Sequence, residues 1–147
     1  MNIKIIKANK KDLEQIVFIE KVSFNDYDRF SKRVFKYFLQ KNRIWIVSID
    51  NKIVGYFILI CYKKSIRIYS IAILPEFRNK GIGEYILKFI IKLAKFLKKE
   101  KILLEVRISN RSKNLYQREG FKVIKLLKDY YENEDGYKME LNLKDKK

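Results

Sequence analysis

A basic, glycine-containing turn at residues 78–83 has the clearest potential for chemistry in this chain. It reads Arg-Asn-Lys-Gly-Ile-Gly and lies between an apolar, β-branched run and a long amphipathic stretch. Glycine lets the backbone turn without a Cβ in the way, so that N–H groups can point at a ligand. A helix that starts at this turn adds unpaired N–H donors and a partial positive charge, and Arg78 and Lys80 add full charges. We therefore expect the turn to bind an anion such as phosphate or pyrophosphate.

Spacing excludes two common phosphate-binding loops. A Walker A loop requires Gly-x-x-x-x-Gly-Lys-Ser/Thr, which is absent from the sequence. A dinucleotide-binding fingerprint requires Gly-x-Gly-x-x-Gly, and Ile86 occupies the place of its third glycine. The remaining pattern is Arg/Gln-x-x-Gly-x-Gly/Ala after a strand that ends near Pro75. The alternative is a plain strand–turn–helix junction with two turn glycines.

Composition restricts the chemistry further. The chain has no histidine, which excludes Ser-His-Asp and Cys-His catalysis and most catalytic zinc sites. A general base must then be Glu, Asp, Lys, Tyr or a water molecule, and we expect no metal. The single cysteine, Cys61, cannot form an internal disulfide, which is typical of a reducing, cytoplasmic location. Because Cys61 lies in an apolar run, we expect it to be buried.

The net charge of +17 favours anionic partners. The lysines are spread through every predicted element rather than gathered in one stripe, so we expect no specific nucleic acid, although the basic surface is compatible with ribosome association. No apolar run is long enough to span a bilayer, and the N-terminal stretch is too short and too rich in lysine for a signal peptide. We therefore expect no membrane partner.

Hydrophobic periodicity predicts one α/β (α+β) domain over residues 1–147 with the order β-α-α-β-β-β-α-β-α-β-β. Ser31 is the predicted N-cap of the second helix, with Phe30 and Phe35 as its hydrophobic staple. A polar loop is expected at residues 128–136. The predicted strands are 3–7, 43–49, 52–62, 65–74, 101–108, 121–127 and 137–143, and the predicted helices are 12–21, 31–41, 83–99 and 111–119.

Four stretches form a specific combination. They are Ile-Ala-Ile at 71–73 followed by the turn at 78–83, Leu-Glu-Val-Arg-Ile-Ser-Asn at 104–110, Leu-Tyr-Gln-Arg-Glu-Gly-Phe at 115–121, and Tyr-Tyr at 130–131 followed by Glu-Asp-Gly-Tyr-Lys-Met at 134–139. The combination resembles the N-terminal (α-amino) acetyltransferases of the GNAT superfamily, and most closely their ribosomal-protein-alanine branch. The chain departs from that branch in having Gly136 where alanine is usual, and one residue fewer between Asn110 and Tyr116.

The resemblance implies the GNAT fold, with a single mixed, mostly antiparallel seven-stranded sheet and about four helices. It also implies acetyl-CoA as cosubstrate, with the pantetheine arm along the strand before the turn and the pyrophosphate on the turn itself. The cofactor-binding residues implied in this way are Ile71, Ala72, Ile73, Arg78, Asn79, Lys80, Gly81, Ile82, Gly83, Glu84 and Asn110.

Catalytic roles also follow from the resemblance. Glu105 would be the general base, acting directly or through a water, and Tyr116 would be the general acid that protonates the CoA sulfur. The backbone N–H of Ile73 is a candidate donor to the thioester carbonyl. Because Glu105 is flanked by leucine and valine, we expect apolar surroundings that raise its pKa. The alternatives are that Glu105 pairs with Arg107 or faces solvent, and that Tyr116 is only a packed aromatic.

The acceptor site implied by the resemblance is a slot walled by Tyr130 and Tyr131, with Phe24 and Tyr27 opposite; alternatively, the tyrosines only cover the end of the sheet. The resemblance implies acetyl transfer to the α-amine of a protein or peptide. Acetylation of lysine or of a small-molecule amine is the alternative within the fold. A non-catalytic acetyl-CoA-binding protein and a ribosome- or RNA-binding module are the alternatives of other classes.

Overall fold

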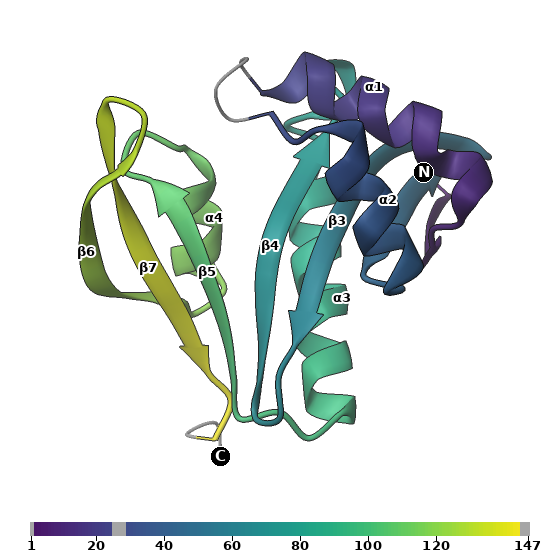
Figure 1. The fold of residues 1–147 in the computed structure, drawn as a ribbon. Coiled ribbons are helices and arrows are strands. Elements are labelled where there is room, and N and C mark those ends of the chain that lie inside the picture. The colour runs from purple at the N-terminus through teal and green to yellow at the C-terminus, as the bar shows by residue number, and fades with distance from the viewer. Residues whose placement is uncertain (1, 25–28, 145–147) are drawn as a thin grey trace. The chain divides into compact units, whose positions relative to one another are not determined.

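The computed structural model describes residues 2–24 and 29–144, and its elements follow the predicted order (Figure 1). The predicted α/β class, with seven strands and four α-helices in the described residues, is confirmed. The strands are β1 (Ile3–Lys7), β2 (Ile44–Ile49), β3 (Lys52–Cys61), β4 (Ser65–Ile73), β5 (Lys101–Arg107), β6 (Lys122–Tyr131) and β7 (Glu134–Asn142), and the helices are α1 (Leu13–Ser23), α2 (Lys32–Gln40), α3 (Ile82–Phe96) and α4 (Ser112–Arg118).

The strands hydrogen-bond in the order β1-β2-β3-β4-β5-β7-β6. The β1–β2, β2–β3, β5–β7 and β6–β7 pairs are antiparallel, and β4–β5 is parallel, so the predicted mixed, mostly antiparallel sheet is confirmed. By internal contacts the chain divides into two compact units, Met1–Leu59 with Ser70–Ile82 (unit 1) and Ile60–Tyr69 with Gly83–Lys147 (unit 2). The expectation of a single domain stays a prediction.

Unit 1 holds α1, α2 and the first three strands up to Leu59. The predicted start of α2 is confirmed, because the Ser31 hydroxyl accepts the Val34 N–H at 3.4 Å. The Phe30 and Phe35 rings pack edge to face, 5.9 Å apart. Glu20 at the end of α1 is buried, and its carboxylate accepts the Phe30 N–H at 2.7 Å and the Tyr56 hydroxyl. The buried side chain of Glu20 is therefore hydrogen-bonded, as a polar group away from water must be.

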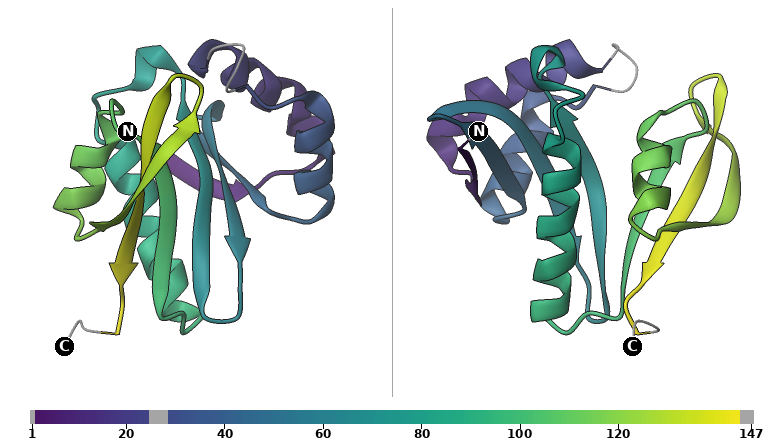
Figure 2. Two further views of the ribbon diagram at one scale, coloured as in Figure 1. Left: turned by 60° about the vertical axis from the view of Figure 1, so that its left-hand side comes forward. Right: turned by 180° about the vertical axis from the view of Figure 1, so that it is seen from behind.

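Unit 2 holds strands β5, β7 and β6, helix α4, and the first part of β4. Alternation along β5 buries Ile102, Leu104 and Val106 on one face, and Figure 2 shows α4 lying beside these strands. The odd-numbered residues of β5, including Glu105, lie on the opposite face. Residues Ser65 to Ile68 of β4 pair in parallel with Lys101 to Leu104 of β5. This ladder brings the first half of β4 next to the strand that carries Glu105.

The expected polar loop at residues 128–136 is wrong. β6 continues to Tyr131 and β7 begins at Glu134, so only a two-residue turn separates them. Asn133 adopts the left-handed conformation that such a turn requires, with a φ of 57°. A shift of register after Leu127 accommodates the polar residues, and the Asp129 N–H donates to the Asp135 carboxylate at 2.8 Å. β6 is the last strand of the sheet and is largely exposed, so its polar sequence did not indicate a strand.

The expected burial of Cys61 is also wrong: this residue ends β3 and is exposed. The apolar run that contains Cys61 thus extends to the end of β3, where side chains are exposed to solvent. Within the described part of the chain, no helix is long and apolar enough to cross a membrane.

Candidate active site

Glu105 is held by an arginine that the sequence did not single out. Arg67 on β4 donates to Glu105 Oε1 from Nε at 2.9 Å and from Nη2 at 2.5 Å. The parallel register pairs Arg67 with Leu103, which puts its side chain on the face of β5 that carries Glu105. Only 13% of the Glu105 side chain and 28% of the Arg67 side chain are exposed. Both contacts use Oε1, so Oε2 accepts no hydrogen bond from the described residues.

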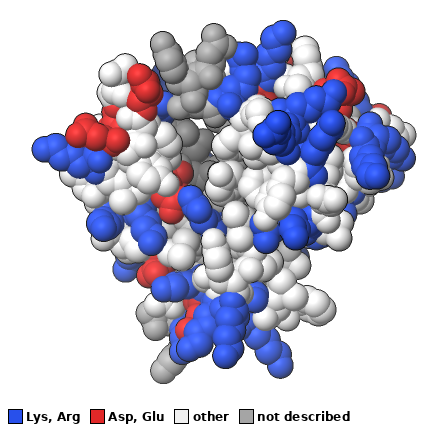
Figure 3. Space-filling view, viewed as in Figure 1, with Lys and Arg blue, Asp and Glu red and all other residues white. Residues whose placement is uncertain are grey.

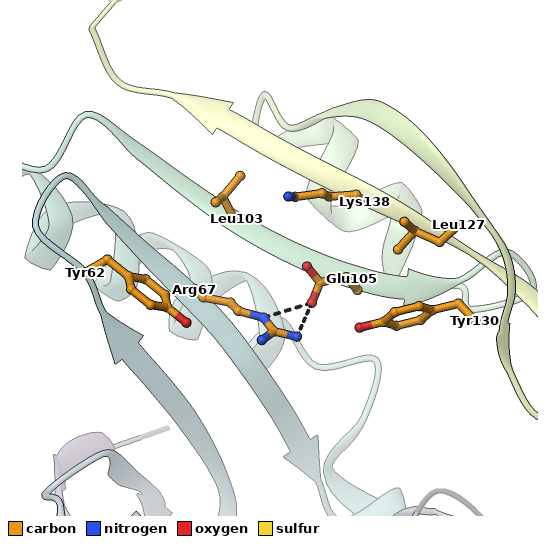
Figure 4. Close-up of a pocket in the computed structure, with 7 residues that line it drawn as sticks. All are labelled: Tyr62, Arg67, Leu103, Glu105, Leu127, Tyr130 and Lys138. Atoms are coloured by element: carbon orange, nitrogen blue, oxygen red, sulfur yellow. Dashed lines mark hydrogen bonds and ion pairs between the residues drawn. The ribbon is translucent and has the colours of Figure 1, made fainter.

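A pocket of about 410 Å³ surrounds this pair, entirely within unit 2. Figure 4 shows the Tyr62 and Tyr130 side chains on either side of the Arg67–Glu105 pair and the Lys138 side chain pointing toward Leu103. The lining residues are Tyr62, Arg67, Leu103, Glu105, Leu127, Tyr130 and Lys138. A carboxylate with one engaged oxygen, set in a pocket with two phenols, can accept a proton from a small polar group.

The expectation of apolar surroundings for Glu105 is wrong, because the side chains nearest its carboxylate include charged ones. Burial lowers the pKa of Arg67, but the hydrogen bond and charge of Glu105, together with Tyr130 and Tyr62, raise it by more, so the guanidinium stays charged.

Arg107, the alternative partner of Glu105, pairs elsewhere. Its Nη1 lies 3.0 Å from Glu134 Oε1 and donates to the Glu132 carbonyl at 3.2 Å. Hydrogen bonds from the side chain and the backbone N–H of Ser109, together with the hydrogen bond and charge of Arg107, lower the pKa of Glu134. The alternative of a Glu105–Arg107 pair is therefore wrong, and Arg107 instead ties β5 to the turn between β6 and β7.

Tyr116 is buried in unit 2, with 6% of its surface exposed. Its ring centroid lies 5.7 Å from that of Phe121, and its carbonyl accepts the Phe121 N–H at 3.0 Å. Burial raises the pKa of Tyr116 to about 12. The hydroxyl therefore keeps its proton at neutral pH, as a proton donor must. The role as general acid stays a prediction beside the alternative of a packed aromatic.

The turn at residues 78–82 belongs to unit 1 and has the geometry of an open cradle. Asn79 and Gly81 have positive φ values of 60° and 81°, and a Cβ added to Gly81 would meet no atom within 4 Å. Arg78 Nε donates to the Ile73 carbonyl at 2.9 Å, which ties the turn to the end of β4. Because α3 begins at Ile82, its unpaired N–H groups directly follow the open space at Gly81. These residues fit a phosphate-bearing cosubstrate such as acetyl-CoA.

Substitutions in this turn test whether it binds acetyl-CoA. Gly81→Val forces a β-branched residue into the left-handed region, and Arg78→Ala removes a charge. We expect each variant to bind acetyl-CoA about tenfold more weakly or worse, the scale of a hydrogen bond to a charged group. Isothermal titration measures this. Lys52→Ala is the control, because Lys52 also lies over the Phe77 ring, as Lys80 does, but outside the turn. Unchanged affinity in folded Arg78→Ala and Gly81→Val would contradict the cradle assignment.

The predicted acceptor residues fall in different places. Phe24 directly follows α1 in unit 1, and Tyr27 lies outside the described residues. Tyr130 lines the pocket and is 49% exposed, and its ring packs edge to face with Tyr131, 4.9 Å away. Tyr131 lies under the Arg107 guanidinium, 4.8 Å from its ring centroid. Of the three that the structure describes, only Tyr130 lines the pocket that contains Glu105.

The departure at residue 136 has a structural reason. A Cβ added to Gly136 would lie 2.7 Å from the Tyr131 ring. The ring therefore occupies the space that an alanine side chain would need. Asn110, the other residue at a departure, accepts the Ser112 N–H at 2.8 Å through Oδ1, and so helps to start α4.

Sequence reasoning missed three polar residues of the pocket, namely Tyr62, Arg67 and Lys138. Strand alternation places Lys138 on the same face of β7 as Glu140. Only the pairing of Lys138 with Glu105 across the β5–β7 ladder shows that the two residues are neighbours.

Comparisons with known proteins agree with the fold described above. A family model described as an acetyltransferase (GNAT) domain matches residues 40–123. An N-alpha-acetyltransferase of Sulfurisphaera tokodaii is 30% identical, with 92% of this chain and 90% of the relative covered. The ribosomal-protein-S18-alanine N-acetyltransferase of Escherichia coli has a similar fold, with a TM-score of 0.87 at 22% identity over 96% of this chain and 94% of that one. A chain of the NatC complex bound to Gag peptide and CoA gives a TM-score of 0.82 at 22% identity, covering 97% and 99%.

Proposed function

Because this chain belongs to the GNAT acetyltransferase family and is an acyltransferase, we propose that it acetylates the N-terminal α-amine of a protein or peptide from acetyl-CoA. The observation that carries the proposal is the Glu105 carboxylate, which lines a pocket and has one oxygen engaged by Arg67 and the other available. The relatives named N-alpha-acetyltransferase support the choice of an α-amine.

In the proposed mechanism Glu105 accepts the proton that the amine must lose, directly or through one water. Arg67 fixes the carboxylate through Oε1, so we assign proton acceptance to Oε2. Tyr62 and Tyr130 line the same pocket and offer hydroxyl groups that can orient the amine or the water. A base placed in this way typically contributes a factor of about 10²–10⁴ to the rate.

Bound acetyl-CoA would supply the activated acetyl group as a thioester. Arg78 to Glu84 would hold its pyrophosphate, Ile71 to Ile73 and Asn110 would hold its pantetheine arm, and the Ile73 N–H would polarise its carbonyl. Tyr116, which keeps its proton because burial raises its pKa to about 12, would donate that proton to the departing sulfur. These roles rest on the resemblance described above and on the open cradle at Gly81.

Proton chemistry favours an α-amine over a lysine side chain. An α-amino group has a pKa of roughly 7.8 and a lysine amine one of roughly 10.4. At pH 7 the neutral lysine nucleophile therefore costs about 3.5 kcal/mol more, because one pKa unit corresponds to about 1.36 kcal/mol. A pocket with one carboxylate, in a chain without histidine, suits the amine that gives up its proton more easily.

Two peptides of one lysine-containing sequence test this choice, one with a free N-terminus and one with a blocked N-terminus. Each is incubated with the protein and acetyl-CoA, and mass spectrometry locates the acetyl group. We expect acetylation of the free α-amine only, with the blocked peptide unmodified. Efficient acetylation of lysine in the blocked peptide would overturn the proposal in favour of a lysine acetyltransferase.

The proposal also includes association with the ribosome and a cytoplasmic location. The net charge of +17 suits a polyanionic surface such as the ribosome, where N-termini emerge. Basic side chains are scattered over the face seen in Figure 3 rather than gathered in one stripe, which supports general attraction rather than recognition of a specific nucleic acid. The single cysteine supports a cytoplasmic location.

A further inference from the structure

The face of unit 2 that carries Glu105 has more cations than carboxylates. Three ion pairs lie on or beside it: Arg67–Glu105 at 2.5 Å, Lys101–Glu140 at 3.5 Å and Arg107–Glu134 at 3.0 Å. Lys138 lies directly opposite Glu105 on β7, and Lys125 lies directly opposite Lys138 on β6. Among the described residues, neither of these lysines has an ion-pair partner. The carboxylates of this face are therefore already used. Three cations are left over among the described residues: Lys138, Lys125 and Lys122, which lies opposite Glu140.

Lys138 is the unpaired cation that lines the pocket. It is half-buried, and Figure 4 shows its side chain pointing toward Leu103, above the Arg67–Glu105 pair in that view. The single charge of Glu105 is already paired with Arg67, and no ion pair joins Glu105 to Lys138 among the described residues. A half-buried ammonium beside a pocket is stabilised most by an anion that enters that pocket, since the local dielectric is lower than that of water.

We propose that Lys138 binds an acidic side chain at the second position of the acceptor peptide, so that the enzyme prefers N-termini followed by aspartate or glutamate. This inference rests on the proposed function, which puts the α-amine of the first residue at Glu105. Residues opposite each other in an antiparallel pair have Cα atoms about 4.5–5.5 Å apart, and an extended chain advances roughly 3.3–3.6 Å per residue. A peptide that has its α-amine at Glu105 and runs from β5 toward β7 would therefore place its second residue beside Lys138.

A matched pair of acceptor peptides tests the proposal. The peptides have a free N-terminus and differ only in having glutamate or the isosteric glutamine at the second position. We expect kcat/KM for the glutamate peptide to be higher by roughly tenfold, at the lower end of what a hydrogen bond to a charged group contributes. Lys138→Gln should remove the preference, and Lys138→Glu should reverse it in favour of a peptide with lysine at that position. Lys125→Gln is the control: it removes another unpaired cation of the face but none from the pocket lining, and the preference should remain.

The outcomes separate this inference from the proposed function. Equal acetylation of both α-amines by the unchanged protein would overturn the role of Lys138 and leave α-amine acetylation standing. A preference for glutamate that persists in folded Lys138→Gln would also overturn that role. Failure to acetylate the α-amine of either peptide would overturn both proposals.

Discussion

Replacing Glu105 with glutamine is expected to lower kcat by about 10²–10⁴, the usual contribution of a general base, while the affinity for acetyl-CoA stays near that of the unchanged protein. Glutamine keeps the size of the side chain and can still accept a hydrogen bond from Arg67 through its carbonyl oxygen, but it cannot take up a proton. Steady-state kinetics with a free N-terminal peptide measure kcat, and titration with acetyl-CoA measures the affinity.

The control for Glu105→Gln is Glu140→Gln. Glu140 lies on the same face of the sheet and pairs with Lys101 at 3.5 Å, but it does not line the pocket. Its replacement also removes one carboxylate charge, so a general electrostatic effect would lower kcat in both variants. A large loss confined to Glu105→Gln supports the base. Near-normal kcat in folded Glu105→Gln would assign proton removal to water or to another residue.

Replacing Tyr116 with phenylalanine is expected to lower kcat by about 10²–10³, because the departing sulfur loses its proton donor. The ring that packs against Phe121 remains, so a purely structural role predicts little change in rate. Tyr137→Phe is the control, since it removes a hydroxyl from β7 in the same unit outside the pocket lining. Equal kcat in Tyr116→Phe and the unchanged protein would restrict Tyr116 to packing.

The pKa of Tyr116 adds a test through stability. Burial raises this pKa from 10.0 to about 12 in the folded protein. Between these values the unfolded chain releases the proton while the folded chain keeps it, so the free energy of unfolding falls as pH rises from 10 through 12. The loss attributable to this one group is about 2–3 kcal/mol. Denaturant unfolding at pH 8 and pH 11 should therefore show a smaller loss for Tyr116→Phe than for the unchanged protein. In the same way, no alkaline fall in kcat below about pH 11 is expected from this tyrosine.

Local patterns in the sequence were enough for the order of the elements and for several of their ends. The start of α2 at Ser31 was predicted from a serine flanked by the aromatic residues Phe30 and Phe35. This was possible because a helix cap involves only residues that are neighbours in the sequence. The open turn at Gly81 was predicted in the same way, and its positive φ agrees with the need for glycine. The polar stretch at residues 128–136 misled for the converse reason: whether an exposed edge segment is a strand depends on β7, with which it pairs.

The surroundings of Glu105 depended on the tertiary structure. Strand alternation places Glu105 and Arg107 on one face, and from the sequence that made Arg107 the natural partner. The partner is instead Arg67, 38 residues away, because the parallel β4–β5 register brings Arg67 to the same face. The antiparallel β5–β7 register likewise sets Lys138 opposite Glu105. The sequence by itself thus determined which residues can do chemistry and on which elements they lie. Which charges meet in the pocket was decided by the pairing of distant strands, since no local pattern records the register between segments far apart in the chain.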